Sequence, residues 1–146
     1  MIRSATRHVS LLCCLPVALL LSGCGGEQGP ECGSPDARNS VVRIVKEDRN
    51  NRLLNFAVDN SSTVEASLRQ ASAEADKAAI REKAKQDAVY GIDDSVVVNS
   101  RAARQAVCTG LLSVTVGDAT VQKDVEFRIE QAADGKIAVS VKPFLF

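Results

Sequence analysis

Five cysteines, at positions 13, 14, 24, 32 and 108, are the residues of this chain with the widest range of possible chemistry. A cysteine thiol can carry a lipid, form a disulfide, bind a metal ion or attack a substrate. Catalytic and metal-binding cysteines usually work with histidine, and the chain has a single histidine, His8. The use of each thiol therefore depends on where the chain is sent and how it is processed.

The first 23 residues have the composition of an export signal. Two arginines and the histidine lie within the first eight residues, and an apolar run from Leu11 to Leu21, interrupted by Pro16, follows with no acidic residue. A permanent membrane helix needs roughly 20 consecutive apolar residues, and this run is shorter. We expect residues 1–23 to be a cleaved signal peptide. A core helix or an uncleaved anchor over residues 11–23 is the alternative.

Leu21, Ser22 and Gly23 stand directly before Cys24. This tetrapeptide resembles the lipobox of bacterial lipoproteins. The resemblance implies a diacylglycerol on the Cys24 sulfur, cleavage before Cys24 and acylation of the new amino group, with palmitate as a typical chain. Several acyl chains give stable anchoring, because each buried methylene contributes about 0.8 kcal/mol. The family's sorting rule retains lipoproteins with aspartate after the cysteine in the inner membrane. Gly25 occupies that position, which implies an outer-membrane lipoprotein facing the periplasm.

Processing at Cys24 would leave Cys32 and Cys108 as the remaining pair of thiols. An even pair in an oxidising compartment predicts a disulfide. The bridge would close a loop of about 76 residues, worth on the order of 4 kcal/mol in the chain-entropy model. Two free buried thiols, or a bridge to a partner protein, are the alternatives. Two thiols without histidine are too few for a zinc site.

Removal of residues 1–23 leaves 123 residues, enough for one compact domain. Sixteen basic and 18 acidic residues remain, and a net charge of about −2 is unlike that of a strongly basic nucleic-acid binder. No histidine remains, which excludes Ser–His–Asp and Cys–His catalysis and histidine-bound metals. With no tryptophan and five other aromatic residues, stacking platforms for bases or sugars are not expected. We expect no cofactor, no metal and no nucleic-acid partner.

The N-terminal half of the mature chain predicts a tether followed by helices. Residues 24–33 are glycine-rich and suit a lipidated flexible tether to a single domain over residues 34–146. Ser34 predicts the start of a helix. Leu53–Val58 are expected to continue this helix, with a short strand as the alternative. Ser62 and Glu65, at capping-box spacing, predict another helix over residues 63–89. Its small apolar stripe, which is either a solvated face or a partner-binding one, consists of Val64, Leu68, Ala71, Ala75, Ala78, Ala79 and Ala88.

From Ser95 onward the apolar residues recur at every second position, which predicts β-strands. Turns are expected at Gly117–Asp118 and Asp134–Gly135. Helices followed by an antiparallel meander predict an α+β fold, with N-terminal helices packed on one face of a three- to four-stranded antiparallel sheet. This element order is similar to that of cystatin-like folds. The expected strands carry Val96 and Val98, then Cys108–Val116, Val121–Ile129 and Ile137–Val141.

Few other residues suggest a reaction centre. The adjacent carboxylates Asp93–Asp94 are typical of a turn, since neighbouring side chains on a strand diverge. No phosphate-binding glycine loop, calcium loop, zinc spacing or nucleophile elbow occurs, and nothing in the sequence places a serine beside a lysine. Arg101 and Arg104 form either a small basic patch, for an anionic partner or lipid headgroup, or a solvated connection between strands.

These patterns favour a membrane-anchored envelope lipoprotein that acts as a non-enzymatic binding or accessory module, with an envelope protein as its partner. An inhibitor or immunity-like lipoprotein that captures a hydrolase or toxin is the second hypothesis. A histidine-independent hydrolase is the third. A polar cleft in which serine, lysine and carboxylate groups converge would favour the third hypothesis.

Overall fold

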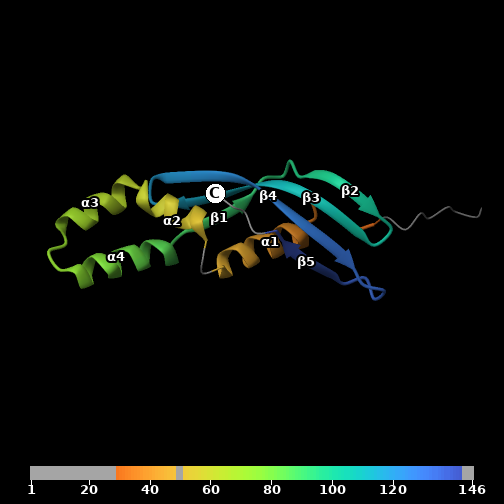
Figure 1. The fold of residues 1–146 in the computed structure, drawn as a ribbon, viewed down its shortest axis with the longest axis horizontal. Helices are drawn as coiled ribbons and strands as arrows, with labels where there is room; N and C mark the ends of the chain where they lie inside the picture. Colours follow the sequence, from red (N-terminus) through yellow and green to blue (C-terminus); the bar gives the residue numbers. More distant parts are fainter. Residues whose placement is uncertain (1–28, 49–50, 143–146) are drawn as a thin grey trace, which may run out of the picture.

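The structure is a computed structural model that describes residues 29–48 and 51–142. The signal segment, Cys24 and Phe144–Phe146 lie outside the described residues. In the described part, four helices precede an antiparallel sheet in an elongated molecule (Figure 1). The predicted α+β class, with helices packed against the sheet, is confirmed.

Helices α1 (Pro35–Glu47) and α2 (Arg52–Asp59) form the first layer. The Ser34 hydroxyl caps α1 by accepting a hydrogen bond from the Ala37 amide at 3.3 Å. The expected continuation toward Val58 is helical, but it is a separate helix. The Asn51 side chain caps α2, because its carbonyl oxygen accepts from the Leu54 amide at 3.1 Å while its amide donates to the Val45 carbonyl. The buried side chains of the two helices are Ala37, Val41, Val45, Leu53, Ala57 and Val58.

Residues 62–86 form a helical hairpin and not the single helix expected over residues 63–89. Helix α3 (Ser62–Gln70) ends before Ala71, and α4 (Glu74–Gln86) begins after Ala73. The two helices contact each other and α2 (Figure 1). Without the break, a straight helix would carry residues 74–86 away from α2. The turn brings the Arg81 guanidinium to 2.9 Å from the Asp59 carboxylate of α2.

Strands β1 (Val89–Ile92), β2 (Val97–Ala102), β3 (Gln105–Val116), β4 (Ala119–Gln131) and β5 (Ile137–Val141) make one antiparallel sheet. The strand order is β1-β3-β4-β5, and β2 also pairs with β3. Since Val89 lies opposite Thr115 and Val97 lies opposite Thr109, β1 and β2 are consecutive pieces of one interrupted edge strand. The assignment of residue 89 to a helix was therefore wrong, and β1 was missed.

The core lies between the sheet and helices α1 and α2. Side chains of β3 alternate strictly along the strand, with Cys108, Leu112 and Val114 fully buried on the helix-covered face. Strand β2 departs from the expected inward alternation: Val98 is exposed, and Val96 precedes the strand and is half-buried. A register shift between Val98 and Ser100 accompanies this change.

Candidate functional site

Cys32 and Cys108 are joined by a disulfide, as predicted, with their α-carbons 5.9 Å apart. Both side chains are buried, so the bridge belongs to the core and is shielded from exchange with external thiols. The bond ties the segment just before α1 to the first half of β3. The N-terminal end of the domain is thereby fixed on the sheet.

The segment that leads to Cys32 is also held by the turn between β2 and β3. Gly29 lies so close to this turn that an added β-carbon would stand 2.7 Å from the Ala102 carbonyl oxygen, which explains why a residue without a side chain is needed. Pro30 is buried beside it. The chain thus reaches the domain at the β2–β3 turn. Sequence reasoning treated Gly29 as part of a flexible tether and missed this contact, because only the folded chain brings residues 29 and 102 together.

The paired carboxylates Asp93 and Asp94 lie in the connection between β1 and β2, and they have different partners. Asp93 accepts hydrogen bonds from the amide and the hydroxyl of Ser95, both at 2.7 Å. These bonds hold the pKa of Asp93 below its ordinary value. Asp94 forms an ion pair with Arg38 of α1. Asp93 therefore shapes the turn that the sequence predicted. Asp94 holds α1 through Arg38, which was not predicted, and the two carboxylates do not face a common substrate position.

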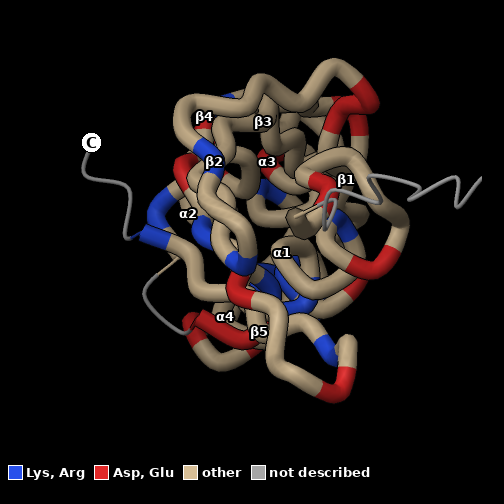
Figure 2. Tube along the Cα trace, turned by 90° about the vertical axis from the view of Figure 1, so that its right-hand side faces the viewer, with Lys and Arg blue, Asp and Glu red and all other residues tan. Residues whose placement is uncertain are grey.

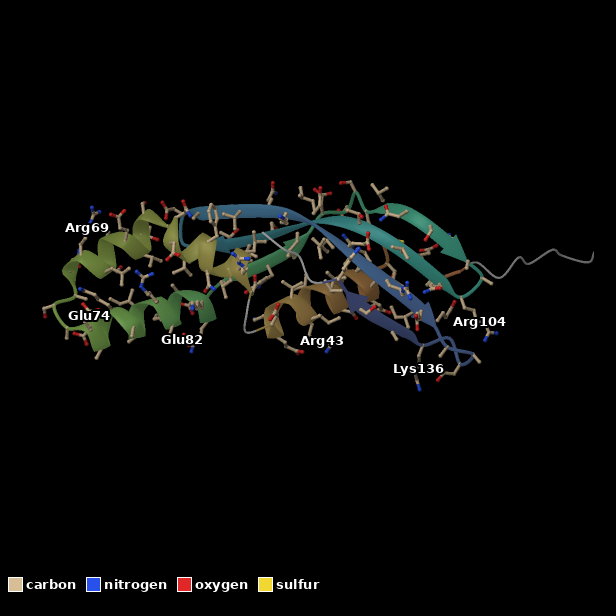
Figure 3. The ribbon with its side chains drawn as sticks, viewed as in Figure 1. Arg43, Arg69, Glu74, Glu82, Arg104 and Lys136 are labelled. Carbon is tan, nitrogen blue, oxygen red and sulfur yellow. A yellow bond between two sulfur atoms is a disulfide. The ribbon has the colours of Figure 1, made fainter. Side chains whose placement is uncertain are left out.

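Arg101 and Arg104 flank the tip of the β2–β3 hairpin, and both are exposed. The Arg104 carbonyl accepts a hydrogen bond from the Gln131 amide at 2.8 Å, so the end of β4 supports the turn. In Figure 3, Arg104 and Lys136 lie at one end of the molecule, whereas Arg69 and Glu74 lie at the other. The hairpin tip and the α3–α4 hairpin are thus opposite ends of the domain.

The alanines of the expected stripe do not share one face. Ala75 and Ala78 of α4 are exposed, Ala71 is half-buried in the bend, and Ala88 is buried beyond the end of α4. The break at residues 71–73 changes the helical phase, and the residues of α4 that face its neighbours are Ile80 and Ala84. The hairpin consequently presents an outer surface of small and charged side chains that the domain itself does not cover.

A polar groove of about 500 Å³ lies between α1, α2 and α4, with Tyr90 of β1 among its lining residues. The Tyr90 hydroxyl lies 3.4 Å from the Asn51 amide nitrogen, from which it can accept a hydrogen bond. Burial raises the pKa of Tyr90, which keeps its hydroxyl protonated at neutral pH. Asn51 is already used to cap α2. Both residues therefore act as structural supports and not as an acid–base pair.

Ser140, Lys142 and Glu126 line a hollow of about 310 Å³ on the sheet, between β4 and β5. This combination is the one that would favour a hydrolase. The Lys142 ammonium lies 3.2 Å from the Glu126 carboxylate and is 70% exposed. A lysine that activates serine is desolvated and bonded to the hydroxyl, whereas this lysine is solvated and paired with a carboxylate. The hollow does not assemble a nucleophile and its base.

A connected polar cluster surrounds Asp118, in the turn between β3 and β4. Its carboxylate accepts hydrogen bonds from the hydroxyls of Ser61 and Ser62 and from the Thr63 amide at the start of α3. The Ser62 hydroxyl, followed by the other donors, holds the pKa of Asp118 far below its ordinary value. Gly117 precedes Asp118 with a φ of 56°, which suits the hairpin turn. The cluster attaches the helical hairpin to the sheet. The turn was predicted from sequence, whereas the attachment was not.

Over residues 29–48 and 51–142, no group of three or more His, Cys, Asp or Glu side chains could hold a metal ion. None of the helices in that part of the chain is long and apolar enough to cross a membrane. Comparison with protein-family models, with curated proteins and with solved structures gives no match.

Proposed function

We propose that this chain is an envelope lipoprotein, anchored through lipid on Cys24 in the outer membrane and facing the periplasm. Its domain would act there as a non-enzymatic binding or accessory module. One observation carries the binding role. The chain joins the domain at the β2–β3 turn, whereas the α3–α4 hairpin projects from the opposite end (Figures 1 and 3). A tether at one end leaves the hairpin directed away from the membrane.

The α3–α4 hairpin suits contact with a protein partner. No residue of α4 is buried in the domain, and α3 buries only Val64. Exposed alanines such as Ala75 and Ala78 permit close approach of another chain, because they carry no long side chain that must be ordered on binding. Arg69, Glu74 and Glu82 add charges of both signs that can select a partner (Figure 3).

Anchoring is tested by metabolic labelling with a fatty acid. We expect wild-type protein to incorporate the label and fractionate with membranes, and Cys24→Ala to do neither, because Cys24 is the proposed attachment point. Cys32→Ala, which leaves Cys24 in place, is the control and should still be labelled. Equal incorporation into wild type and Cys24→Ala contradicts the anchor.

Partner contact is tested by photo-crosslinking in intact cells, with a photoreactive residue at position 75 or 78. The matched control is position 122, where Gln122 is exposed on β4. We expect one shared adduct from both α4 positions. The adduct from position 75 should be lost in Ala78→Glu and the adduct from position 78 in Ala75→Glu, with a nearly unchanged thermal midpoint, since both side chains are exposed. Adducts that are equally strong from position 122 contradict a partner-binding surface on α4. A hydrolase or toxin in the adduct supports the inhibitor hypothesis, and an envelope-assembly protein supports the accessory one.

A further inference from the structure

We propose that the free edge of strand β5 is a peptide-binding site, to which an extended acidic segment of a partner protein adds as a further strand of the sheet. In this mode of recognition, main-chain hydrogen bonds supply affinity and side chains supply selectivity. The site is separate from the α3–α4 hairpin and does not depend on the lipid anchor. It goes beyond the function proposed above, because it gives the domain a second contact surface of defined chemistry.

The first argument is the hydrogen bonding of β5, which pairs with β4 on one side only. The Lys142 amide donates to the Glu126 carbonyl at 2.9 Å, and the Lys136 carbonyl accepts from the Ala132 amide at 2.8 Å, both in the register of the two strands. In an antiparallel ladder, alternate residues direct both backbone groups toward the same neighbour. Even-numbered residues of β5 therefore bond to β4, and odd-numbered residues direct their N–H and C=O groups to the free edge.

These outward groups belong to Ile137, Val139 and Val141. Among the described residues, no hydrogen bond joins them to a backbone or side-chain group beyond the β4 ladder. Figures 1 and 2 both place β5 at the margin of the molecule. Each of the three residues offers one donor and one acceptor, and a peptide of about five residues would extend about 17 Å along them. The backbone of β5 is therefore ready to accept another strand.

The second argument is the groove beside this edge. It has a volume of about 530 Å³ and lies between α1 and the start of β5. Odd-numbered residues of β5 face α1, since Val139 pairs with Ile129, whose side chain is buried. An added strand would direct every second side chain the same way, toward polar groups of α1 spaced three or four residues apart. These groups belong to Asp36, Asn39, Ser40 and Arg43. The groove therefore favours a peptide with polar side chains on that face.

The third argument is charge. No residue of β5 is charged, but Lys136 precedes the strand and Lys142 follows it, with side chains 85% and 70% exposed. Arg43, which lines the groove, is 64% exposed and projects from the same side of the molecule as Lys136 (Figure 3). Each of the three has a carboxylate neighbour at 3.1–3.9 Å, but ion pairs this exposed contribute little to stability and can exchange partners. Asp36 is the one acidic residue that lines the groove, so basic groups predominate.

The same charges disfavour a second copy of the chain as the occupant. Two copies of β5 paired antiparallel about Val139 would place Lys136 of one copy opposite Lys142 of the other, at both ends of the pair. Like charges directly opposite each other destabilise a strand pair, and lysines at a sheet edge oppose self-pairing. Carboxylates at these two positions would instead form cross-strand ion pairs. The charges at the edge therefore favour an acidic peptide.

The site is tested with two synthetic peptides, acetyl-ETVTVTE-amide and its basic counterpart acetyl-KTVTVTK-amide, added to the whole protein labelled with ¹⁵N. Amide exchange with water is measured by NMR. We expect Ile137, Val139 and Val141 to exchange about threefold more slowly at about 1 mM acidic peptide, which corresponds to a dissociation constant of about 0.5 mM. The amides of Ala138 and Ser140, which already bond to β4, should not change. The basic peptide should have no effect on any of the five.

Lys136→Glu/Lys142→Glu should reverse the preference, so that the basic peptide slows exchange and the acidic one does not. The control is Arg69→Glu/Lys83→Glu, which changes the net charge equally at side chains 69% and 76% exposed on the α3–α4 hairpin, and it should behave as wild type. Equal slowing by both peptides, or slowing by neither, overturns the proposal. Odd-numbered amides of β5 that are already as slow as the even-numbered ones without peptide also overturn it. Slowing that depends on protein concentration would identify a second copy as the occupant, and slowing that does not would identify another part of the chain.

Discussion

The sheet body and the α3–α4 hairpin differ sharply in how they are held. In the sheet body, Cys108, Leu112, Phe127 and Ile129 are essentially inaccessible to solvent, and a disulfide ties β3 to the N-terminal segment. The hairpin buries one side chain, Val64, and is attached through polar contacts at Asp118 and at the Arg81–Asp59 ion pair. The contrast indicates that stability resides in one region, while the other is free to serve as a contact surface.

Removal of the disulfide should have the largest effect. Cys32→Ala/Cys108→Ala releases a constraint on a loop of 76 residues and leaves small cavities in the core, so we expect a loss of about 4 kcal/mol. The thermal midpoint should fall by about 10 °C or more in calorimetry. Wild-type protein that is unfolded, reduced and refolded without the disulfide should show the same lowered thermal midpoint. Cys24→Ala is the control, and its midpoint should match that of the wild type.

Replacing one isoleucine by alanine in each region should lower the free energy of unfolding by different amounts. Ile129→Ala, in the core of β4, should cost about 2–5 kcal/mol in the free energy of unfolding, because it leaves a cavity in a closely packed interior. Ile80→Ala, at a half-buried position of α4, should cost about 1 kcal/mol or less. Urea titration of both variants measures the difference. Equal losses would mean that the hairpin belongs to the same cooperative core as the sheet.

Asp118 joins the two regions. Of the substitutions considered, its replacement should change stability least, and the change should depend most on pH. Its folded-state pKa lies below its ordinary value of 3.8, so its contribution is complete above about pH 4 and is lost as the pH falls through the folded-state pKa. Asp118→Asn should lower the thermal midpoint modestly at pH 7, and the gap to wild type should narrow below pH 4.

The comparison of these midpoints across pH uses Asp124→Asn, at an exposed carboxylate of β4, as the control. A gap between Asp118→Asn and wild type that stays constant down to pH 2 would show that the carboxylate charge does not stabilise the attachment. Faster hydrogen exchange confined to residues 62–70 in Asp118→Asn would locate the loss in the hairpin.

The strands β3 to β5 and their turns were well predicted because the sequence signals for them lie within the elements themselves. Period-two alternation from Cys108 to Val116 and from Val125 to Ile129 matches the buried face, and both glycine-containing turns lie where their residues indicate. Ser34 and Pro35 likewise mark the start of α1. In each case the residues that carry the signal are also the residues that form the element.

Elements that depend on distant partners were predicted less well. Val89, Tyr90 and Ile92 favour a strand, but the segment has only four residues, contains Gly91 and directly follows a helical stretch. Pairing with residues 112–115 of β3 makes it a strand. The bend at residues 71–73 lies in an alanine-rich segment with high helix propensity, and it forms where α4 must return to contact α2.

The features considered for function divide in the same way, into those predicted from the sequence and those placed only by the tertiary structure. The sequence alone predicted the α+β class, from the order of its periodic segments, and the pairing of Cys32 with Cys108, from cysteine counting; the expected lipid on Cys24 follows from the lipobox resemblance. Only the tertiary structure decided that Gly29 lies against the β2–β3 turn, and that Arg104 and the α3–α4 hairpin lie at opposite ends of the domain. The physical reason is that local periodicity and cysteine counting describe what a segment buries or bonds, whereas orientation relative to a membrane depends on contacts between residues more than 70 positions apart.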